Sequence, residues 1–250
     1  MTRRLILFDV DGTLIRRGDP AHLAAIDHAL HRVLPTTRQV SIDQIDFDGK
    51  VDRQLFGLLL ERAGLGPKVP EATLQALFDA AVDAYRVSWG DRLGDDDLLP
   101  GVAGLLTRLR GDERFALGVV TGGLRGIVAR KLHRLRLADC LPVGAFGDEV
   151  ERRPALLLLA VSRAAAHYGV PFPPSRVVVV GDTPLDVDCA HSGGAAAVGV
   201  ATGRFTVTEL RGAGADTALE NLAETDRVVA TLLTVATAGS PVEAQAKGCP

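Results

Sequence analysis

The sequence has few cysteines and no long apolar run. Its cysteines, Cys140, Cys189 and Cys249, are odd in number and far apart, and they form no C-x-x-C pair. This pattern excludes a disulfide framework and a cysteine zinc site, and it favours a reducing cytoplasm. The longest uninterrupted apolar run, residues 155–161, is far shorter than the ~20 residues that span a bilayer. The apolar stretch near the N-terminus ends at Asp9, too early for an export signal.

The chain also has no large excess of charge of either sign. The chain carries 28 basic and 31 acidic residues, a net charge of −3. With no overall basic field, we expect neither a nucleic-acid nor a membrane partner. Lysine is rare among the basic residues, a skew typical of GC-rich bacterial genomes. The 250 residues suit one large domain or one domain with an insertion, and they leave monomer and homodimer both open.

Short apolar runs alternate with longer helical stretches along most of the chain. The runs are apolar on both faces, as buried parallel strands are. Such alternation predicts an α/β fold with a doubly wound, Rossmann-like parallel sheet. The predicted strands are residues 5–8, 116–120, 177–180 and 195–200, and the predicted helices are residues 102–109, 123–135, 155–168 and 185–192.

One long stretch after the first strand breaks this alternation. It shows helical periodicity and no strand, with Asp19 and Pro20 as the start signal of its first helix. The sequence therefore predicts a core domain, residues 1–17 and 98–235, and an inserted all-helical domain, residues 18–97. The predicted inserted helices are residues 20–34, 51–63 and 70–89, and the acidic residues 95–97 mark the return. The small, polar tail, residues 236–250, is predicted to be disordered.

Paired carboxylates follow the first predicted strand. Asp9 and Asp11 are two residues apart, and Gly12 permits a turn directly after them. In a parallel sheet, sites form at the carboxyl ends of the strands. Carboxylates at such a point suit a hard cation such as Mg²⁺, or a division into nucleophile and acid/base. A lone D-x-D is more often a capped turn with two solvated aspartates.

Two further strand ends carry polar residues. Thr121 and Gly122 lie between a strand and a helix start, where backbone N–H groups bind phosphate. Asp182 ends another strand, and Asp186 follows four residues later. Each of these features alone also fits an ordinary helix cap.

The order and spacing of these motifs together are more specific than any one motif alone. D-V-D-G-T-L at residues 9–14, V-V-T-G-G at 119–123 and G-D-T-P-L-D-V at 181–187 follow one another in the chain. This arrangement resembles the haloacid dehalogenase (HAD) superfamily of phosphohydrolases. The resemblance covers about residues 3–235, and residues 215–222 are similar to the last part of such phosphatases.

The resemblance implies a role for each motif residue. Asp9 would be the nucleophile that takes the phosphoryl group, and Asp11 would protonate the leaving oxygen and later activate water. Thr121 and the amide of Gly122 would hold phosphoryl oxygens. The implied cofactor is Mg²⁺, and the implied metal site consists of Asp9, the main-chain carbonyl of Asp11, Asp182 and, through the metal's waters, Asp186.

The third motif of the family departs from its usual form. The family usually has a lysine, often before proline, and this chain has Arg152 and Arg153 before Pro154. Arginine also supplies positive charge and grips phosphate with its fork. Pro154 suits the first helical position, which puts Arg153 at the N-cap. In an extended segment Arg152 would point to the opposite side, so we expect Arg153 to provide the charge.

The inserted helices resemble the cap of phosphoglycolate phosphatases and their relatives, which closes over the site. The polar segment 48–53 opens a helix, and its Lys50 and Arg53 are candidate substrate-binding residues. A solvated loop explains this segment equally simply. The expected partner is a small phosphorylated metabolite, with phosphoglycolate as the first candidate substrate.

Alternative functions remain at this stage. A β-phosphoglucomutase-like phosphotransferase would share all the motifs. Dehalogenation is disfavoured because those relatives need no proton donor at the position of Asp11. Phosphonoacetaldehyde hydrolysis would use a cap lysine, for which Lys50 is available, but that family has a small residue in place of Asp11. A non-catalytic metabolite-binding module has no use for Asp11 beside Asp9.

Overall fold

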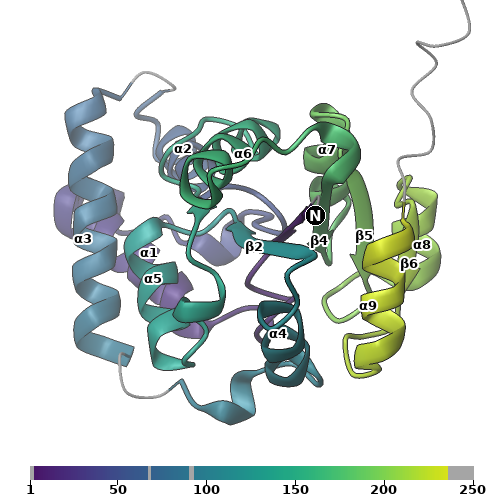
Figure 1. The fold of residues 1–250 in the computed structure, drawn as a ribbon. Coiled ribbons are helices and arrows are strands. Elements are labelled where there is room, and N and C mark those ends of the chain that lie inside the picture. The colour runs from purple at the N-terminus through teal and green to yellow at the C-terminus, as the bar shows by residue number, and fades with distance from the viewer. Residues whose placement is uncertain (1–2, 67–68, 90–92, 236–250) are drawn as a thin grey trace, which may run out of the picture.

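A computed structural model describes residues 3–66, 69–89 and 93–235. Over these residues it shows a six-stranded, all-parallel sheet in the order β3-β2-β1-β4-β5-β6 (Figure 1). The strands are β1 Arg4–Phe8, β2 Phe115–Val120, β3 Gly144–Ala145, β4 Val177–Gly181, β5 Ala196–Val200 and β6 Thr217–Leu219. The predicted doubly wound α/β fold is confirmed. Cys249 and the predicted disordered tail, residues 236–250, lie outside the described residues.

Successive strand residues face opposite sides of the sheet, so a strand that is apolar throughout supplies two cores. In β1, Ile6 and Phe8 join one buried cluster, and Leu5 and Leu7 join the other. The first cluster is covered by α4 Val102–Arg110, α5 Arg125–Arg134 and α9 Thr225–Thr234. The second is covered by α6 Pro154–Tyr168, α7 Pro184–Ser192 and α8 Val207–Gly212.

Helices inserted between β1 and α4 form the predicted all-helical cap. They are α1 Pro20–Val33, α2 Asp52–Arg62 and α3 Glu71–Trp89, and they share a hydrophobic cluster of their own. As the sequence predicts, Asp19 caps α1, where its side chain accepts a hydrogen bond from the backbone N–H of Ala21 at 2.9 Å. Leu124 and Ile127, at the start of α5, belong to the same cluster, so the cap packs onto this core helix (Figure 1).

The two chain segments that connect core and cap lie side by side. Ile15, after β1, forms an antiparallel bridge with Leu98, before α4. The boundaries at residues 18 and 97 stay a prediction, and this pairing lies next to both of them. Short 3₁₀ turns complete the connections, at Pro35–Thr37, Ile42–Gln44, Asp95–Asp97, Ala138–Cys140 and Pro174–Arg176.

The sequence missed β3, β6, α8 and α9. β3 has two residues and β6 has three, too few to show a period of two, and α8 has only six. The predicted helix at 123–135 begins later, at Arg125, because Leu124 has extended rather than helical dihedral angles. None of the helices in the described ranges is both long and apolar enough to cross a membrane.

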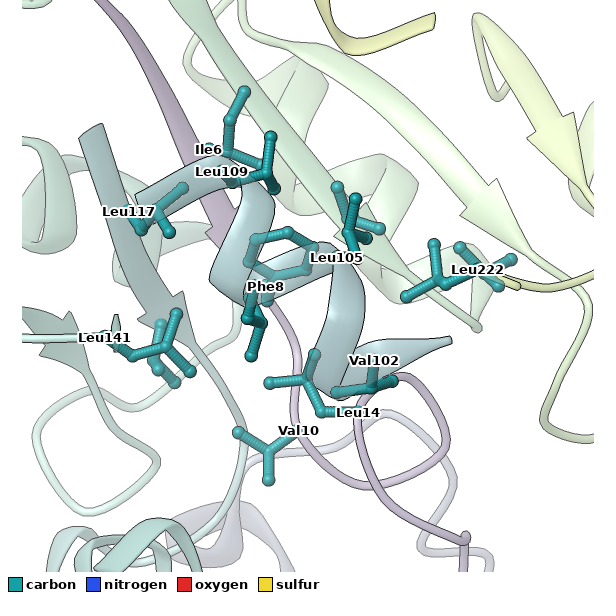
Figure 2. Close-up of a cluster of buried hydrophobic side chains, with 14 of the residues drawn as sticks. Ile6, Phe8, Val10, Leu14, Val102, Leu105, Leu109, Leu117, Leu141 and Leu222 are labelled. Carbon is teal, nitrogen blue, oxygen red and sulfur yellow. The ribbon is translucent and has the colours of Figure 1, made fainter. Parts of the chain in front are cut away.

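Leu105 of α4 offers a test of the core. It is fully buried in the cluster that contains Phe8 and Leu109 (Figure 2). We expect Leu105→Ala to lower the free energy of unfolding by about 2–5 kcal/mol, because it removes apolar contacts and leaves a cavity. Leu158 of α6 is 68% exposed, and Leu158→Ala should stay within about 0.5 kcal/mol. Chemical denaturation of both variants gives the comparison, and equal losses would contradict this view of the core.

Candidate active site

A cavity of about 90 Å³ lies where the carboxyl ends of β1, β2 and β4 meet the cap. The structure brings most of the predicted site residues to it. Those that line the cavity are Asp9, Asp11, Thr121, Gly122, Arg153 and Asp182 from the core and Lys50 from the cap. A small, partly open cavity with several charged side chains thus lies between the core and the cap.

Three buried carboxylates form the acidic part of this site. Asp9, Asp182 and Asp186 each place one oxygen so that all three lie within 4.8 Å of one another, and each side chain is almost fully buried. Burial raises the pKa of Asp9 to about 7 and that of Asp182 to about 8, with the neighbouring carboxylates adding to the rise and Arg153 opposing it. A cluster of oxygen donors with this excess of negative charge fits a hard divalent cation.

The position of Asp182 depends on two glycines. A Cβ atom at Gly12 would lie 2.4 Å from Asp182 Oδ2, and one at Gly203 would lie 1.7 Å from the same atom. Gly12 also has a φ of +95°, a conformation that L side chains rarely adopt. Thr13 Oγ1 donates a hydrogen bond to Asp182 Oδ1 at 3.3 Å. The backbone thus leaves one narrow place for this carboxylate, directly against the loop after β1.

Arg153 is the basic residue in contact with the buried carboxylates. Its Nη2 lies 2.9 Å from Asp9 Oδ1 and also forms an ion pair with Asp186. Its Nη1 donates to the backbone carbonyl of Gly49, in the cap, at 2.9 Å. Arg152 is exposed. The backbone at Arg153 is helical, with φ −52° and ψ −40°, so the extended conformation we expected there is wrong, although Arg153 does take the N-cap position of α6.

One nitrogen of the Arg153 guanidinium has no hydrogen-bond partner among the described residues. This nitrogen, Nε, is buried. A buried donor without an acceptor costs about 1–3 kcal/mol. Arg153 itself lines the cavity, so its guanidinium places a fixed positive charge there.

Thr121 and Gly122 follow β2 and lie under the cap. Thr121 is buried, and its Oγ1 accepts a long hydrogen bond, 3.4 Å, from the backbone N–H of Gly123. A Cβ at Gly122 would lie 2.2 Å from the carbonyl oxygen of Lys50, so only glycine fits there. The carbonyl of Gly122 accepts a hydrogen bond from the backbone N–H of Asp52 at 2.7 Å. The segment 48–53 therefore rests directly on this loop.

The two candidate substrate-binding residues of the cap are placed differently. Lys50 lines the cavity, and its Nζ lies 3.0 Å from the exposed carboxylate of Asp46. Arg53 does not line the cavity, and both of its terminal nitrogens pair with Glu71 of α3. Lys50 is therefore available to a ligand, and the structure does not bring Arg53 to the site.

Sequence analysis did not single out His22, although it also lines the cavity. Its Nε2 lies 2.8 Å from Asp52 Oδ2, and the same oxygen accepts a hydrogen bond from the backbone N–H of Leu124 at 2.7 Å. This group joins α1, α2 and the start of α5. The available signal was a histidine on the apolar face of α1, in line with Ala25 and Ile26.

Sequence analysis did not single out Lys131 either. It lies on α5 and is fully buried. Its Nζ lies 2.7 Å and 3.0 Å from the two carboxylate oxygens of Asp11 and 3.1 Å from Asp19 Oδ2. Sequence analysis assigned Asp19 only as a helix cap. A lysine between Val128 and Leu132 on an apolar helix face was the signal that could have found this group.

Comparison with known proteins identifies the family. The family profile described as haloacid dehalogenase-like hydrolase matches residues 3–194. The chain belongs to this family. The suspected HAD resemblance is confirmed, and so, at the level of the family, is the prediction of an enzyme: this HAD-like protein is a hydrolase.

Curated relatives of this HAD-like hydrolase are named phosphatases. Phosphoserine phosphatase SerB2 of Mycobacterium tuberculosis is 30% identical over 210 residues, which cover 80% of this chain and 44% of that protein. The chain thus spans less than half the length of that relative. Phosphoglycolate phosphatase of Salmonella paratyphi A is 29% identical over 217 residues, which cover 80% of this chain and 82% of that one.

Solved structures share the fold of the hydrolase. β-Phosphoglucomutase from Clostridium difficile matches with a TM-score of 0.68 and 18% identity, over 93% of this chain and 98% of that one. A predicted phosphoglycolate phosphatase from Haemophilus somnus matches with a TM-score of 0.61 and 20% identity, over 92% and 99% of the two chains. At these identities the likeness shows the architecture, a parallel sheet with an inserted helical cap, and not the substrate.

The raised pKa values of the buried carboxylates predict that the metal-free protein loses stability as pH rises. An acid whose pKa is raised on folding binds its proton more tightly in the folded state, so stability falls as pH rises from about 4, the unfolded value, toward about 8. A divalent cation should raise Tm in solution at pH 8 and do so less at pH 5. Asp182→Asn removes one buried charge, so it should raise the metal-free Tm at pH 8 and abolish the response to metal.

Thermal unfolding with a chelator or with excess Mg²⁺, at both pH values, checks this expectation. Each kcal/mol corresponds to about 2–4 °C for a chain of this size. A metal-free Tm that is lower for Asp182→Asn than for the wild type at pH 8 would contradict it.

Proposed function

We propose that this hydrolase is a Mg²⁺-dependent phosphatase that acts on a small phosphorylated metabolite through an aspartyl-phosphate on Asp9. The observation that carries the proposal is the convergence of Asp9, Asp11 and Arg153 on one small, largely buried cavity. A nucleophile, a proton donor and a fixed positive charge are the parts that phosphoryl transfer needs.

In the first step, an oxygen of Asp9 attacks phosphorus, and the bond between phosphorus and the leaving oxygen breaks. Asp11 gives its proton to that oxygen, and the alcohol departs. Repulsion between the Asp9 carboxylate and the phosphate is reduced by the positive charge of Arg153, whose Nη2 lies 2.9 Å from Asp9 Oδ1. Thr121 Oγ1 and the amide of Gly122 would hold the remaining oxygens.

In the second step, water cleaves the aspartyl-phosphate. Asp11 takes a proton from the attacking water, a new phosphorus–oxygen bond forms, and the bond to Asp9 breaks. Inorganic phosphate and free Asp9 result, and Asp11 is again protonated for the next cycle. The cap over the cavity limits the entry of bulk water during the transfer.

The acidic cluster supports Mg²⁺ as the cofactor. Asp9, Asp182 and the main-chain carbonyl of Asp11 would hold the ion, and Asp186 would bind its waters. When bound, the ion supplies positive charge that offsets the negative charge gathered in the transition state. The same cluster leaves Asp9 and Asp182 with raised pKa values when no cation is present, which supports the need for one.

Phosphoglycolate is the first candidate substrate because curated relatives carry that name. The basic side chains of the cap that line the cavity already have carboxylate partners, and Lys50 has the most exposed one. Lys50 is therefore the side chain that can turn to a substrate carboxylate at the lowest cost. We further propose that the enzyme works in the cytoplasm, as a monomer or homodimer, with no nucleic-acid or membrane partner.

Phosphate release by the purified protein tests the proposal. We expect Mg²⁺-dependent release from p-nitrophenyl phosphate and from members of a panel of small phosphorylated metabolites that includes phosphoglycolate, phosphoserine and β-glucose 1-phosphate. Asp9→Asn keeps the shape but removes the attacking charge, so kcat should fall by at least about 10³-fold. Retention of a tenth of the wild-type turnover would overturn the assignment of Asp9.

The panel also separates the alternative functions. A β-phosphoglucomutase-like enzyme would convert β-glucose 1-phosphate into glucose 6-phosphate with little release of phosphate. A binding module would shift its Tm with a metabolite but release no phosphate from any compound.

The neighbouring Arg152 provides a matched control for substitutions of Arg153. Arg153→Ala removes the buried guanidinium from Asp9, and kcat/KM should fall by about 2–4 kcal/mol in transition-state stabilisation. Arg153→Lys should recover much of this loss, because a point charge serves the same need. Arg152 is exposed, so Arg152→Ala should stay within about 0.5 kcal/mol. Kinetics at saturating Mg²⁺ compare the three, and a larger loss for Arg152→Ala would contradict the assignment.

A further inference from the structure

Lys131 is a buried lysine that the reaction above does not use. Its side chain has no exposed surface, and its Nζ contacts both carboxylate oxygens of Asp11, at 2.7 Å and 3.0 Å. The same Nζ lies 3.1 Å from Asp19 Oδ2. Both of these carboxylates come from the segment that follows β1, and Asp11 precedes Lys131 by 120 residues.

The position of Lys131 on α5 explains how it reaches Asp11. Ile127, one turn earlier, belongs to the hydrophobic cluster of the cap, whereas Val128 and Leu132 belong to a core cluster. The side chain of Lys131 therefore extends from α5 at the boundary between the cap cluster and the core cluster. Burying a charge without good partners costs several kcal/mol, and apolar side chains fill such boundaries at lower cost. A lysine at this place calls for a role other than packing.

Asp19 and Tyr85 hold Lys131 from the side of the cap. Tyr85 is buried on α3, and its hydroxyl donates a hydrogen bond to Asp19 Oδ2 at 2.9 Å. The other oxygen of Asp19 accepts from the N–H of Ala21. Although burial opposes its ionisation, Lys131 keeps the pKa of Asp19 below its usual value. Asp19 is thus a fixed anion, and it is the second carboxylate that holds the ammonium, beside Asp11.

We propose that Lys131 is a positioning residue for Asp11: its ammonium fixes the carboxyl plane of the proton donor toward the cavity, and Asp19 and Tyr85 fix the ammonium. This inference rests on the proposed phosphatase function. Lys131 does not touch the phosphoryl group, and it acts only through Asp11.

The geometry leaves Asp11 free to react. Each carboxylate oxygen has two lone pairs, and Lys131 uses one on each. The side chain of Asp11 is still 25% exposed, and it lines the cavity. Two contacts to one nitrogen restrict rotation of the carboxyl group, which a single contact would allow. Since a misplacement of about 1 Å can cost 10²-fold in rate, fixing this group matters for proton transfer.

The test compares leaving groups. Lys131→Met keeps the length of the side chain and removes the ammonium. For an alkyl phosphate, whose alcohol needs a proton to leave, we expect kcat/KM to fall by about 10²-fold, the contribution typical of general acid catalysis. For 2,4-dinitrophenyl phosphate, whose phenolate leaves without a proton, we expect a loss below about threefold. Equal losses on both substrates would overturn the proposal, because a merely structural lysine affects both alike.

A double variant makes the test independent of that one substitution. If Lys131 acts through Asp11, then Lys131→Met has nothing further to remove once Asp11→Asn is present. The double variant should match Asp11→Asn within about twofold on the alkyl phosphate, as expected for residues that act as a unit. A further tenfold loss would contradict the proposal.

Asp19→Asn covers the case in which Lys131→Met does not fold. Asparagine still caps α1 and still accepts the Tyr85 hydrogen bond, but it no longer anchors the ammonium by charge. We expect a loss of about three- to tenfold on the alkyl phosphate and none on the dinitrophenyl ester. Equal losses on both would overturn the proposal here too.

Tyr168→Phe is the control for general loss of stability. Its hydroxyl binds the backbone of Leu117 in the core, away from the cavity. It should change both substrates equally. A wild-type protein that releases no phosphate would overturn the proposed function and this inference with it. An active wild type, an inactive Asp9→Asn and equal losses for Lys131→Met would overturn the inference alone.

Discussion

The contact between Arg153 and the carboxylates of Asp9 and Asp186 is the interaction on which the site depends. Three carboxylates are gathered where water is largely excluded, and their repulsion would separate β1 from the start of α7 without a positive charge between them. The same guanidinium binds Gly49 of the cap. One buried side chain thus joins the end of β1, helix α7 and the cap.

The regular part of the fold could be predicted from the sequence because each central strand is apolar on both faces. β1, β4 and β5 are long enough to show this, and the aspartates Asp9 and Asp182 mark the ends of β1 and β4. β3 and β6 could not be predicted in the same way. They lie at the two edges of the sheet, where pairing on one side suffices, and their few residues carry no periodicity.

The candidate site could be predicted as far as it lies at strand ends. Asp9, Thr121 and Asp182 each follow a recognisable strand, and a parallel sheet brings such positions together. Lys131 and His22 lie within helices and not at strand ends, and their partners are distant in the chain. Only the tertiary packing of the chain, within the cap for His22 and around the start of the cap for Lys131, creates those contacts. The signal for both residues in the sequence was a polar side chain on a helix face that is otherwise apolar.

The prediction for Arg153 shows that a correct position can come from an incorrect conformation. An alternating extended chain was expected to turn Arg152 away, and the structure achieves the same separation with the first turn of α6. Side-chain direction in a helix start is set by the turn itself, and adjacent residues diverge there as well.

At one place the cap and the core meet backbone against backbone. A Cβ at Gly147 would lie 1.6 Å from the carbonyl oxygen of Gly122, which itself accepts the hydrogen bond from the first residue of α2. A single methyl group at Gly147 would therefore act as a wedge. Such a variant would have to move the loop after β2 or the start of α2, so a change of one carbon atom in the core would alter how the cap is seated without touching any side chain that lines the cavity.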